Sequence, residues 1–225
     1  MELKIINSPS PNYGERPSGG KIDTLVIHYT DTETAEAAIE ILTDPASAVS
    51  AHYVIDIDGA VHALVDEEKR AWHAGVGYWR GNRDLNSHSI GIELQNTGAW
   101  FGLTPFPPPQ MNALLMLSRR ICAHWPIEAR NVIGHSDLAP DRKIDPGPYF
   151  DWRWLSEHGI GLWPLKAPVS SNNADPMTLL SEIGYDIGAE QAVRAFQLHY
   201  RPQRTDNILD PETIDLLIGL HRKIA

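Results

Sequence analysis

Short apolar runs alternate with segments of helical spacing, and this alternation constrains the fold more than any other feature. The runs at 25–27 ("LVI"), 89–94 ("SIGIEL") and 132–133 ("VI") are brief and bounded by polar residues, as in buried strands. Between them, 32–44 and 111–124 place apolar residues on one face of a helix. Strands interleaved with helices predict an α/β fold, with a mixed central β-sheet flanked by helices.

Local signals mark where some of these elements begin and end. The helix after the first run carries a threonine cap and ends before Pro45. Asp58-Gly59 between two β-rich runs indicates a hairpin, and Gly159 is suited to end the last helix of this part of the chain. Residues 1–20 are rich in Pro, Gly, Ser and Asn, and we expect them to form an extended arm.

The composition changes near residue 165, which divides the chain into two expected domains. Residues 1–165 contain the alternating elements, and 166–175 have the composition of a Pro/Ser/Asn linker without apolar periodicity. Residues 176–225 contain three segments with apolar residues at helical spacing, and the third begins with the capping sequence "DPE" at 210–212. We therefore expect a small all-α three-helix C-terminal domain.

Composition excludes several classes of protein. The formal net charge of -10 argues against a nucleic-acid binder, which usually presents a basic face. No stretch approaches the roughly 20 apolar residues that span a bilayer. The N-terminus lacks an apolar run of signal-peptide length, so we expect a cytoplasmic protein, or a periplasmic or outer-membrane one if a leader was removed. The single cysteine, Cys122, cannot form an internal disulfide. We expect the protein to be a monomer.

Two histidines stand where strands are expected to end. His28 follows 25–27 directly, and His135 follows Gly134 at the start of "GHSDLAPDRKIDPGP". A strand end is held by the sheet yet faces its open rim, although each histidine by itself is also consistent with a structural role. Asp145 lies further along the same loop, which is stiffened by prolines. Two imidazoles and a carboxylate leave one tetrahedral position open, as in a catalytic zinc site, so we expect one Zn²⁺ per chain.

Glu93 and Lys143 are the candidates for the reacting groups. Glu93 interrupts the apolar run 89–94, where a carboxylate is costly unless it is paired or used. It could be a salt-bridged residue of an edge strand, or a general base that activates water beside the zinc. Lys143, shortly before Asp145, could stabilise an oxyanion, although a solvated lysine is the simpler interpretation of that loop by itself.

Four segments taken together resemble a known family. They lie between about residues 25 and 161, and they are "LVIHYT", "SAHYVIDIDGAVHALVDEEKRAWHAG", "LNSHSIGIELQN" and "IGHSDLAPDRKIDPGP". In order and spacing they are similar to the successive motifs of the zinc N-acetylmuramoyl-L-alanine amidases. That family includes bacterial cell-wall amidases, phage lysozyme-amidases and peptidoglycan recognition proteins.

The resemblance implies a full set of site residues. It implies zinc bound by His28, His135 and Asp145. It also implies Glu93 as the catalytic acid/base and Lys143 as the residue that stabilises the tetrahedral intermediate. The reaction it implies is hydrolysis of the amide between the lactyl group of N-acetylmuramic acid, or of its anhydro form, and L-alanine of the stem peptide. Peptidoglycan or muropeptides would then be the partners.

For substrate contacts the resemblance is less complete. It places His73 near the core of the fold or in the substrate groove, not on the metal, and the segment that begins with Trp72 in the wall of the cleft. Relatives often hold an arginine and an asparagine against the peptide, and here Asn86 matches the asparagine. Asp84 stands where the arginine is common, and Arg83 could replace it with an offset of one residue. Recognition of the stem peptide therefore stays open.

The C-terminal segment also resembles a known module. The sequences "IGYDI" and "AFQLHY" and the helix start "DPET" are similar to the three-helix peptidoglycan-binding module of wall hydrolases. Such a module would direct the catalytic domain to polymeric peptidoglycan without taking part in the chemistry. A purely structural bundle is the alternative.

Two other functions are compatible with the same fold. A non-catalytic recognition protein would bind muropeptides without the metal, but here all the ligand and catalytic positions are filled. A zinc peptidase would keep the site and cut within the stem peptide instead. Substrate preference also stays open, because the missing leader favours recycling of anhydro-muropeptides whereas a wall-binding tail favours intact sacculi.

Overall fold

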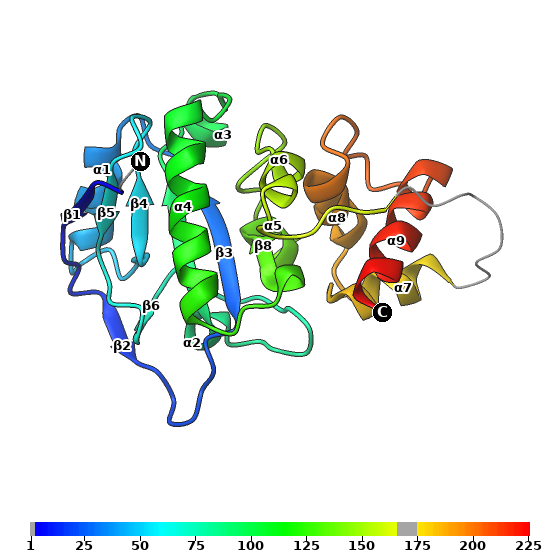
Figure 1. The fold of residues 1–225 in the computed structure, drawn as a ribbon, viewed down its shortest axis with the longest axis horizontal. Coiled ribbons are helices and arrows are strands. Elements are labelled where there is room, and N and C mark those ends of the chain that lie inside the picture. The colour runs from blue at the N-terminus through cyan, green and yellow to red at the C-terminus, as the bar shows by residue number, and fades with distance from the viewer. Residues whose placement is uncertain (1–2, 166–174) are drawn as a thin grey trace.

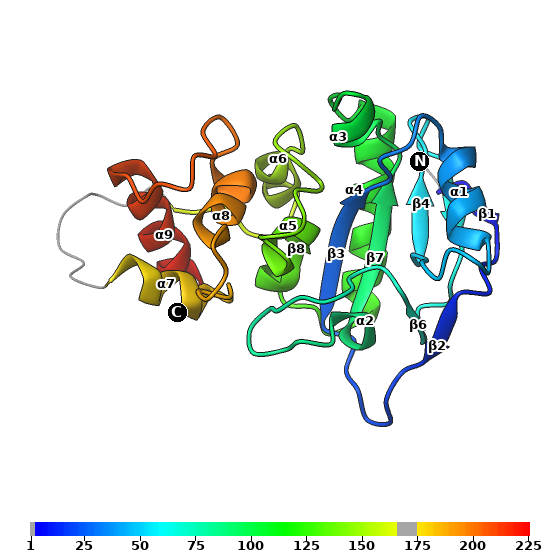
Figure 2. The same ribbon diagram turned by 180° about the vertical axis from the view of Figure 1, so that it is seen from behind.

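A six-stranded mixed sheet forms the centre of the computed structural model, which describes residues 3–165 and 175–225 (Figure 1). From one edge to the other, the strands are β1 (Ile5–Asn7), β5 (Val61–Ala63), β4 (Tyr53–Ile55), β7 (Ser89–Leu94), β3 (Thr24–Tyr29) and β8 (Val132–Gly134). Strand β3 is parallel to β7 and β8, and β4 is parallel to β7 but antiparallel to β5. Helices flank the sheet (Figure 2), so the predicted α/β fold with a mixed central sheet is confirmed.

The parallel strands β7, β3 and β8 place the polar residues at their carboxyl ends side by side. Every residue of β3 is buried, as expected for a parallel strand covered on both faces. Its register sets His28 beside Glu93 of β7 and Ile27 beside Gly134 of β8. Residues at the carboxyl ends of these three strands therefore share one edge of the sheet.

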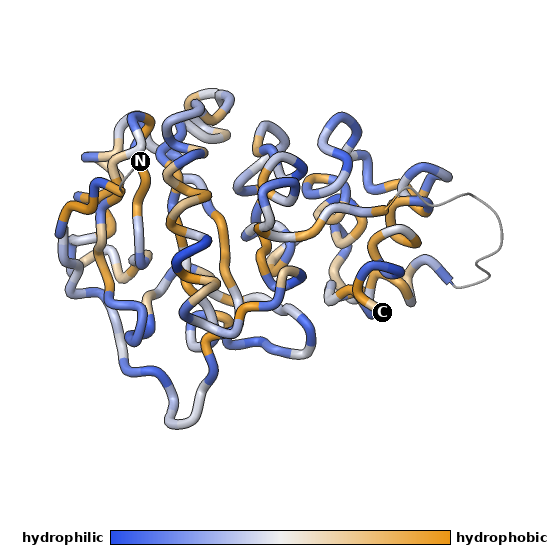
Figure 3. Tube along the Cα trace, viewed as in Figure 1, coloured by the Kyte–Doolittle hydropathy of each residue, from blue (hydrophilic) through white to orange (hydrophobic). Residues whose placement is uncertain are grey.

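Helix α4 (Pro108–His124) covers one face of the sheet (Figure 1). Its buried residues Leu114, Leu117 and Ile121 belong to the main hydrophobic core, and polar residues alternate with apolar ones along it (Figure 3). Helix α1 (Ala35–Thr43) is capped by the side chain of Thr34, which accepts from the N–H of Ala37, as a threonine cap predicts. The remaining elements of this part are β2 (Tyr13–Glu15), β6 (Lys69–Ala71), α2 (Leu85–His88), α3 (Gly98–Phe101), the 3-10 helix η1 (Ala129–Asn131), α5 (His135–Leu138) and α6 (Trp152–Glu157).

The turn signals in the sequence are confirmed. Gly59 joins β4 and β5 with a φ of 87°, a conformation that favours glycine, and Gly159 follows α6 with a φ of 88°. One helix boundary differs from the expectation. Helix α4 begins at Pro108 rather than Met111, because prolines in the first turn need not donate a backbone hydrogen bond.

The N-terminal arm is extended, as expected, but it is also part of the sheet structure. Strand β1 adds to the edge of the central sheet beside β5, and β2 pairs with β6. Arg16 then enters the protein and donates to the backbone carbonyls of Glu67, Asn86, Ser87 and Ser89. Strand pairing and the hydrogen bonds of Arg16 therefore attach the arm to the rest of the protein.

The C-terminal segment forms three helices beyond β8 and α5 (Figures 1 and 2), as the apolar periodicity predicts. They are α7 (Pro176–Ile183), α8 (Ala192–Tyr200) and α9 (Pro211–Ile224), and residues 166–174 of the expected linker lie outside the described residues. The apolar core of the bundle is continuous with buried residues of the larger part. Its residues Tyr185 and Phe196 belong to one apolar cluster with Ile133 and Leu138 of the larger part. None of the helices in residues 3–165 and 175–225 combines the length and the apolar character of a membrane-spanning segment.

Candidate metal centre

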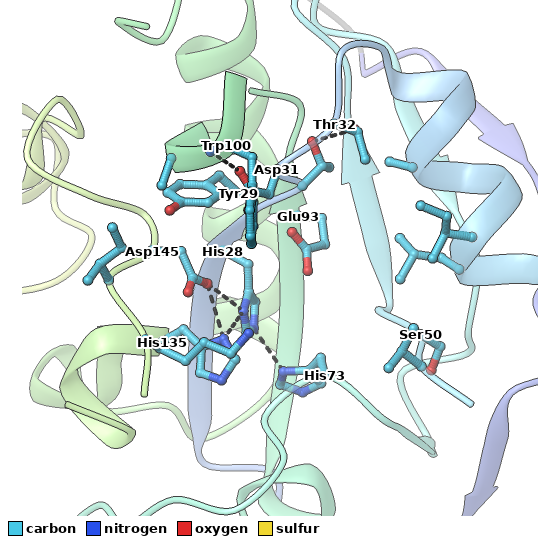
Figure 4. Close-up of a pocket in the computed structure, with 18 of the residues that line it drawn as sticks. His28, Tyr29, Asp31, Thr32, Ser50, His73, Glu93, Trp100, His135 and Asp145 are labelled. Atoms are coloured by element: carbon cyan, nitrogen blue, oxygen red, sulfur yellow. Dashed lines mark hydrogen bonds and ion pairs between the residues drawn. The ribbon is translucent and has the colours of Figure 1, made fainter. Parts of the chain in front are cut away.

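The two histidines and the aspartate singled out in the sequence converge beyond the ends of the strands (Figure 4). His28 is near the end of β3, His135 opens α5 directly after β8, and Asp145 lies in the loop that follows α5. Oδ2 of Asp145 is 3.1 Å from Nδ1 of His28 and 3.1 Å from Nδ1 of His135. The two Nδ1 atoms are 3.0 Å apart.

Hydrogen bonds on the far side of the His28 ring fix the position of its proton. The hydroxyl of Ser89 donates to the carbonyl of Leu85 at 2.5 Å, so its oxygen accepts from Nε2 of His73 at 3.0 Å. Nδ1 of His73 is then unprotonated and accepts from Nε2 of His28 at 2.9 Å. This chain of donors leaves Nδ1 of His28 without a proton.

His135 is oriented in the same way by a backbone carbonyl. Its Nε2 lies 3.0 Å from the oxygen of Ala74, and because a carbonyl only accepts, Nε2 carries the proton. Nδ1 is therefore the ring nitrogen of His135 that faces Asp145 and His28 and is placed to bind a metal. The Nδ1 atoms of His28 and His135 and a carboxylate oxygen of Asp145 thus face one another, an arrangement of three possible ligand atoms that a bound cation stabilises.

Burial sets the charge of these groups. Burial, and after it the neighbouring His135, lower the pKa of His28 to about 4, so the His28 ring is neutral near pH 7. Burial alone would raise the pKa of Asp145, but the adjacent His135 and His28 outweigh it and hold this pKa well below its usual range. A neutral imidazole and an ionised carboxylate are the forms that bind a metal, so the donor set fits Zn²⁺.

Glu93 lies beside this group, on the strand that pairs with the strand of His28. Its Oε2 is buried and has no hydrogen-bond partner in the part of the chain that the structure describes. Burial raises the pKa of Glu93 well above its usual value and Asp145 raises it further, whereas Lys143 lowers it. A carboxyl group with a raised pKa and a free oxygen is suited to take up and release a proton.

A cavity of about 530 Å³ contains all of these side chains (Figure 4). It also takes in Trp100, which is 85% exposed on α3. The residues singled out in the sequence that line this cavity are His28, Trp72, His73, Glu93, His135, Lys143 and Asp145. A volume of this size is in the usual range for small-ligand sites, roughly 300–1,000 Å³.

The structure places the other two candidate substrate residues away from this cavity. The side-chain oxygen of Asn86 accepts the backbone N–H groups of His73 at 3.0 Å and Ala74 at 2.8 Å, so it shapes the segment beneath the cavity. Arg83 lies over the ring of Tyr78 and pairs with Asp186 of the C-terminal part at 3.3 Å.

Some residues that shape the site were not singled out in the sequence. Ser89 accepts the last hydrogen bond of the chain that runs from His28 through His73. Gly91 leaves space for the His73 ring, since a Cβ at Gly91 would lie 2.5 Å from that ring. Arg142 donates to the carbonyl of Ala74 that orients His135. A glycine inside the apolar strand was the one available signal, because it marks a close approach by another group.

The fold and this site together define a class of protein, the metal-dependent hydrolases. Three donor atoms meet at the carboxyl edge of an α/β sheet, and a carboxyl group with a free oxygen lies next to them. An open cavity gives a substrate access to both. This combination is what hydrolysis at a metal site requires.

Comparison with known proteins identifies the family. Residues 18–148 match the family model described as N-acetylmuramoyl-L-alanine amidase. The N-acetylmuramoyl-L-alanine amidase AmiD of Escherichia coli is 38% identical over 224 residues, covering 86% of this chain and 80% of that protein. The chain belongs to the N-acetylmuramoyl-L-alanine amidase family, a metal-dependent type of amide hydrolase, and is an enzyme of that family.

Solved structures and a shorter relative agree with this result. The complex of AmiD from E. coli with anhydro-N-acetylmuramic acid-L-Ala-D-gamma-Glu-L-Lys has a TM-score of 0.80 and covers 94% of this chain and 98% of that one, at 33% identity. AmpDh3 of Pseudomonas aeruginosa, in complex with anhydromuramic pentapeptide, has a TM-score of 0.82 and covers 95% and 97%, at 34% identity. The 1,6-anhydro-N-acetylmuramyl-L-alanine amidase AmpD of Enterobacter cloacae is 37% identical over 161 residues, which are 64% of this chain and 84% of that protein.

Proposed function

We propose that this enzyme is a zinc-dependent N-acetylmuramoyl-L-alanine amidase with one Zn²⁺ held by His28, His135 and Asp145. It hydrolyses the amide bond between N-acetylmuramic acid, or its anhydro form, and L-alanine of the peptidoglycan stem peptide. The observation that carries the proposal is the convergence of three possible ligand atoms, from His28, His135 and Asp145, next to Glu93 in a cavity of about 530 Å³. The complexes of AmiD and AmpDh3 with anhydromuramyl peptides support this class of substrate.

The residues of the cavity divide the chemistry among them. When bound, zinc acts as a Lewis acid that polarises a carbonyl oxygen and makes water more acidic. Glu93 takes the proton of the water that attacks the lactyl carbonyl, and then passes it to the nitrogen of L-alanine as the amide bond breaks. Lys143, which lines the same cavity, directs its ammonium at the oxyanion that forms on the carbonyl.

The substrate contacts are proposed from the lining of the cavity. Trp72 and the exposed Trp100 offer apolar ring surfaces suited to a sugar ring or to the lactyl group. His73 contributes by holding the His28 ring rather than by touching substrate. Arg83 and Asn86 lie outside the cavity lining. Asn86 supports the segment of His73 and Ala74 from within the protein. The part of the stem peptide beyond L-alanine would reach Arg83 only if it extends toward the C-terminal bundle.

The experiment that tests the proposal is mass spectrometry of the products from a soluble anhydro-muropeptide. We expect an intact stem peptide and a free anhydro-muramic acid sugar, with the reaction stopped by a zinc chelator and restored by added Zn²⁺. Fragments of the stem peptide would instead identify a peptidase, and binding without products would identify a recognition protein. As a control on the ligand set, His135→Ala should lose both the zinc and the activity.

The division of labour between the two parts of the chain is also a proposal. Residues 1–165 hold the complete catalytic set, and residues 176–225 form the three-helix module, joined by 166–175. The similarity of this module to peptidoglycan-binding bundles supports contact with polymer. Comparing rates on purified sacculi and on a soluble anhydro-muropeptide would decide which substrate the enzyme prefers, and we propose that it acts as a monomer on both.

A further inference from the structure

Asp137 is a fully buried carboxylate close to the metal centre. It lies on α5, two residues after His135, and its Oδ2 accepts the backbone N–H of Gly134 at 2.7 Å. Its two side-chain partners come from the C-terminal bundle. Tyr185 donates its hydroxyl to Oδ1 at 2.6 Å, and Nδ1 of His199 donates to Oδ2 at 2.7 Å.

The two donors from the bundle are themselves held in place. The His199 ring stacks on Trp152 at 3.8 Å and on Tyr200 at 4.0 Å between centroids, with planes 17° apart in each case. Its Nε2 is buried without a partner among residues 3–165 and 175–225, so the bond to Asp137 is the one that orients the ring. Tyr185 is only 1% exposed. Neither donor can turn away without leaving a polar group unpaired inside the protein.

Asp137 is connected to both ligands that this loop contributes. Helix α5 has four residues, so Asp137 and His135 belong to the same helical turn. The backbone N–H of Ser136, which lies between them, donates to the carbonyl oxygen of Asp145 at 2.9 Å. A displacement of the Asp137 carboxylate would therefore change the positions of the two ligands together.

We propose that Asp137, Tyr185 and His199 are positioning residues, through which the C-terminal bundle holds His135 and Asp145 in the geometry that binds the metal. The inference rests on the proposed function, because it takes these two residues as zinc ligands. It gives the bundle a role inside the catalytic centre in addition to any contact with peptidoglycan. Removing a residue that supports a metal ligand typically weakens metal binding by about 10- to 100-fold. We expect a loss of this size when Asp137 loses either of its donors from the bundle.

The test measures metal binding in single variants of the full chain. Tyr185→Phe and His199→Phe keep an aromatic ring at each position and remove the donor to Asp137. We expect the Kd for Zn²⁺, measured by competition with a chelator, to rise about 10- to 100-fold in each variant. The absorption spectrum of the Co²⁺-substituted protein should also change, because it reports the geometry of the ligands.

Two further variants separate positioning from general stability. Tyr200→Phe makes the same chemical change on the neighbouring residue, whose hydroxyl is not bonded to Asp137, and should leave the Kd and the spectrum unchanged. His199→Asn keeps an N–H near the position of Nδ1 and should recover part of the affinity even if it lowers the melting temperature. An unchanged Kd and Co²⁺ spectrum in Tyr185→Phe and His199→Phe would overturn the inference. If the wild type failed to bind Zn²⁺ at all, the proposed function itself would be wrong.

Discussion

Glu93 has no hydrogen-bond partner for its buried Oε2, which is unusual for a carboxylate and sets it apart from the other acids of the chain that the structure describes. A group used only for structure would be paired, whereas a group that exchanges protons with water and with a leaving nitrogen must be free to do so. Lys143 and Asp145 act on its pKa in opposite directions. The pKa of Glu93 is raised mainly by burial and further by Asp145, while Lys143 offsets part of the rise.

From this we predict that Glu93→Gln keeps zinc but lowers kcat by at least about 10²-fold, the usual effect of losing a general base. Lys143→Ala should lower kcat by about 10²- to 10³-fold, as expected for the loss of one oxyanion donor. The measurement is turnover of a soluble muropeptide together with metal content. Glu36→Gln, on the exposed surface of α1, is the matched control and should behave as the wild type. Near-normal turnover of a zinc-loaded Glu93 or Lys143 variant would remove that residue from the mechanism.

The residues of the site differ in how far the sequence could identify them. His28 and His135 follow apolar strands, and Glu93 interrupts one, so each stands out in a local pattern. Asp137 lies in the same motif as His135, yet its partners Tyr185 and His199 are 48 and 62 residues away. No local pattern encodes such a contact, because it depends on how the bundle docks.

Strand β4 begins directly after His52, whose ring is fully buried between this strand and its neighbours. Its Nδ1 accepts the backbone N–H of Gly91 in β7. Burial, and after it the charge of Arg16, lower the pKa of His52 to about 3. The folded protein thus keeps this imidazole neutral at pH values where the unfolded chain, with an ordinary pKa of 6.5, becomes protonated.

We therefore predict that the metal-free protein loses stability as the pH falls from 6.5 toward 3. Protons then bind the unfolded state preferentially, and one such histidine contributes a slope of about 1.4 kcal/mol per pH unit. Because His52→Asn retains an acceptor for the Gly91 N–H but has no titrating ring, its slope should be smaller by about that amount. Urea unfolding at pH 7, 6 and 5 measures the difference. Parallel pH dependences in the two proteins would contradict this account of His52.

Regular elements were predicted well where they carry their own signal. The buried strands β3, β7 and β8 and the long helix α4 have apolar patterns that identify them without their neighbours. Strands β1 and β2 are three residues each and form only by pairing with β5 and β6, so the arm could be predicted as extended but not as part of the sheet. Pairing partners far along the chain decide such short strands.

The two parts of the molecule share an apolar cluster, although the sequence indicates a linker between them. Ile133 and Leu138 from the region of the metal centre pack in one cluster with Leu180, Tyr185 and Phe196 of the bundle. A bundle of about fifty residues buries too little surface to be stable by a wide margin, and docking onto the larger part adds to its burial. The composition change near residue 165 marks a boundary in the chain but not in the core.

For the metal-free full-length protein, we predict a single unfolding transition in differential scanning calorimetry. The shared cluster couples the two parts, so neither can lose its packing while the other keeps all of it. The calorimetric and van't Hoff enthalpies should then agree. Two resolved transitions, with the smaller one belonging to the bundle, would show that the contact through Tyr185 and Phe196 is too weak to couple them.

The ends of the central sheet also bear on how the protein behaves at high concentration. Strand β1 and strand β8 are the two outermost strands, and each contains three residues. Beyond β8 lie α5 and the bundle (Figure 1), so β1 is the more open of the two edges. An unpaired edge is where a second molecule can add a strand and begin aggregation, and short edges resist this. The formal net charge of -10 makes copies of the enzyme repel one another. The short edge strands and this repulsion together oppose the addition of strands between molecules that would lead to fibrils.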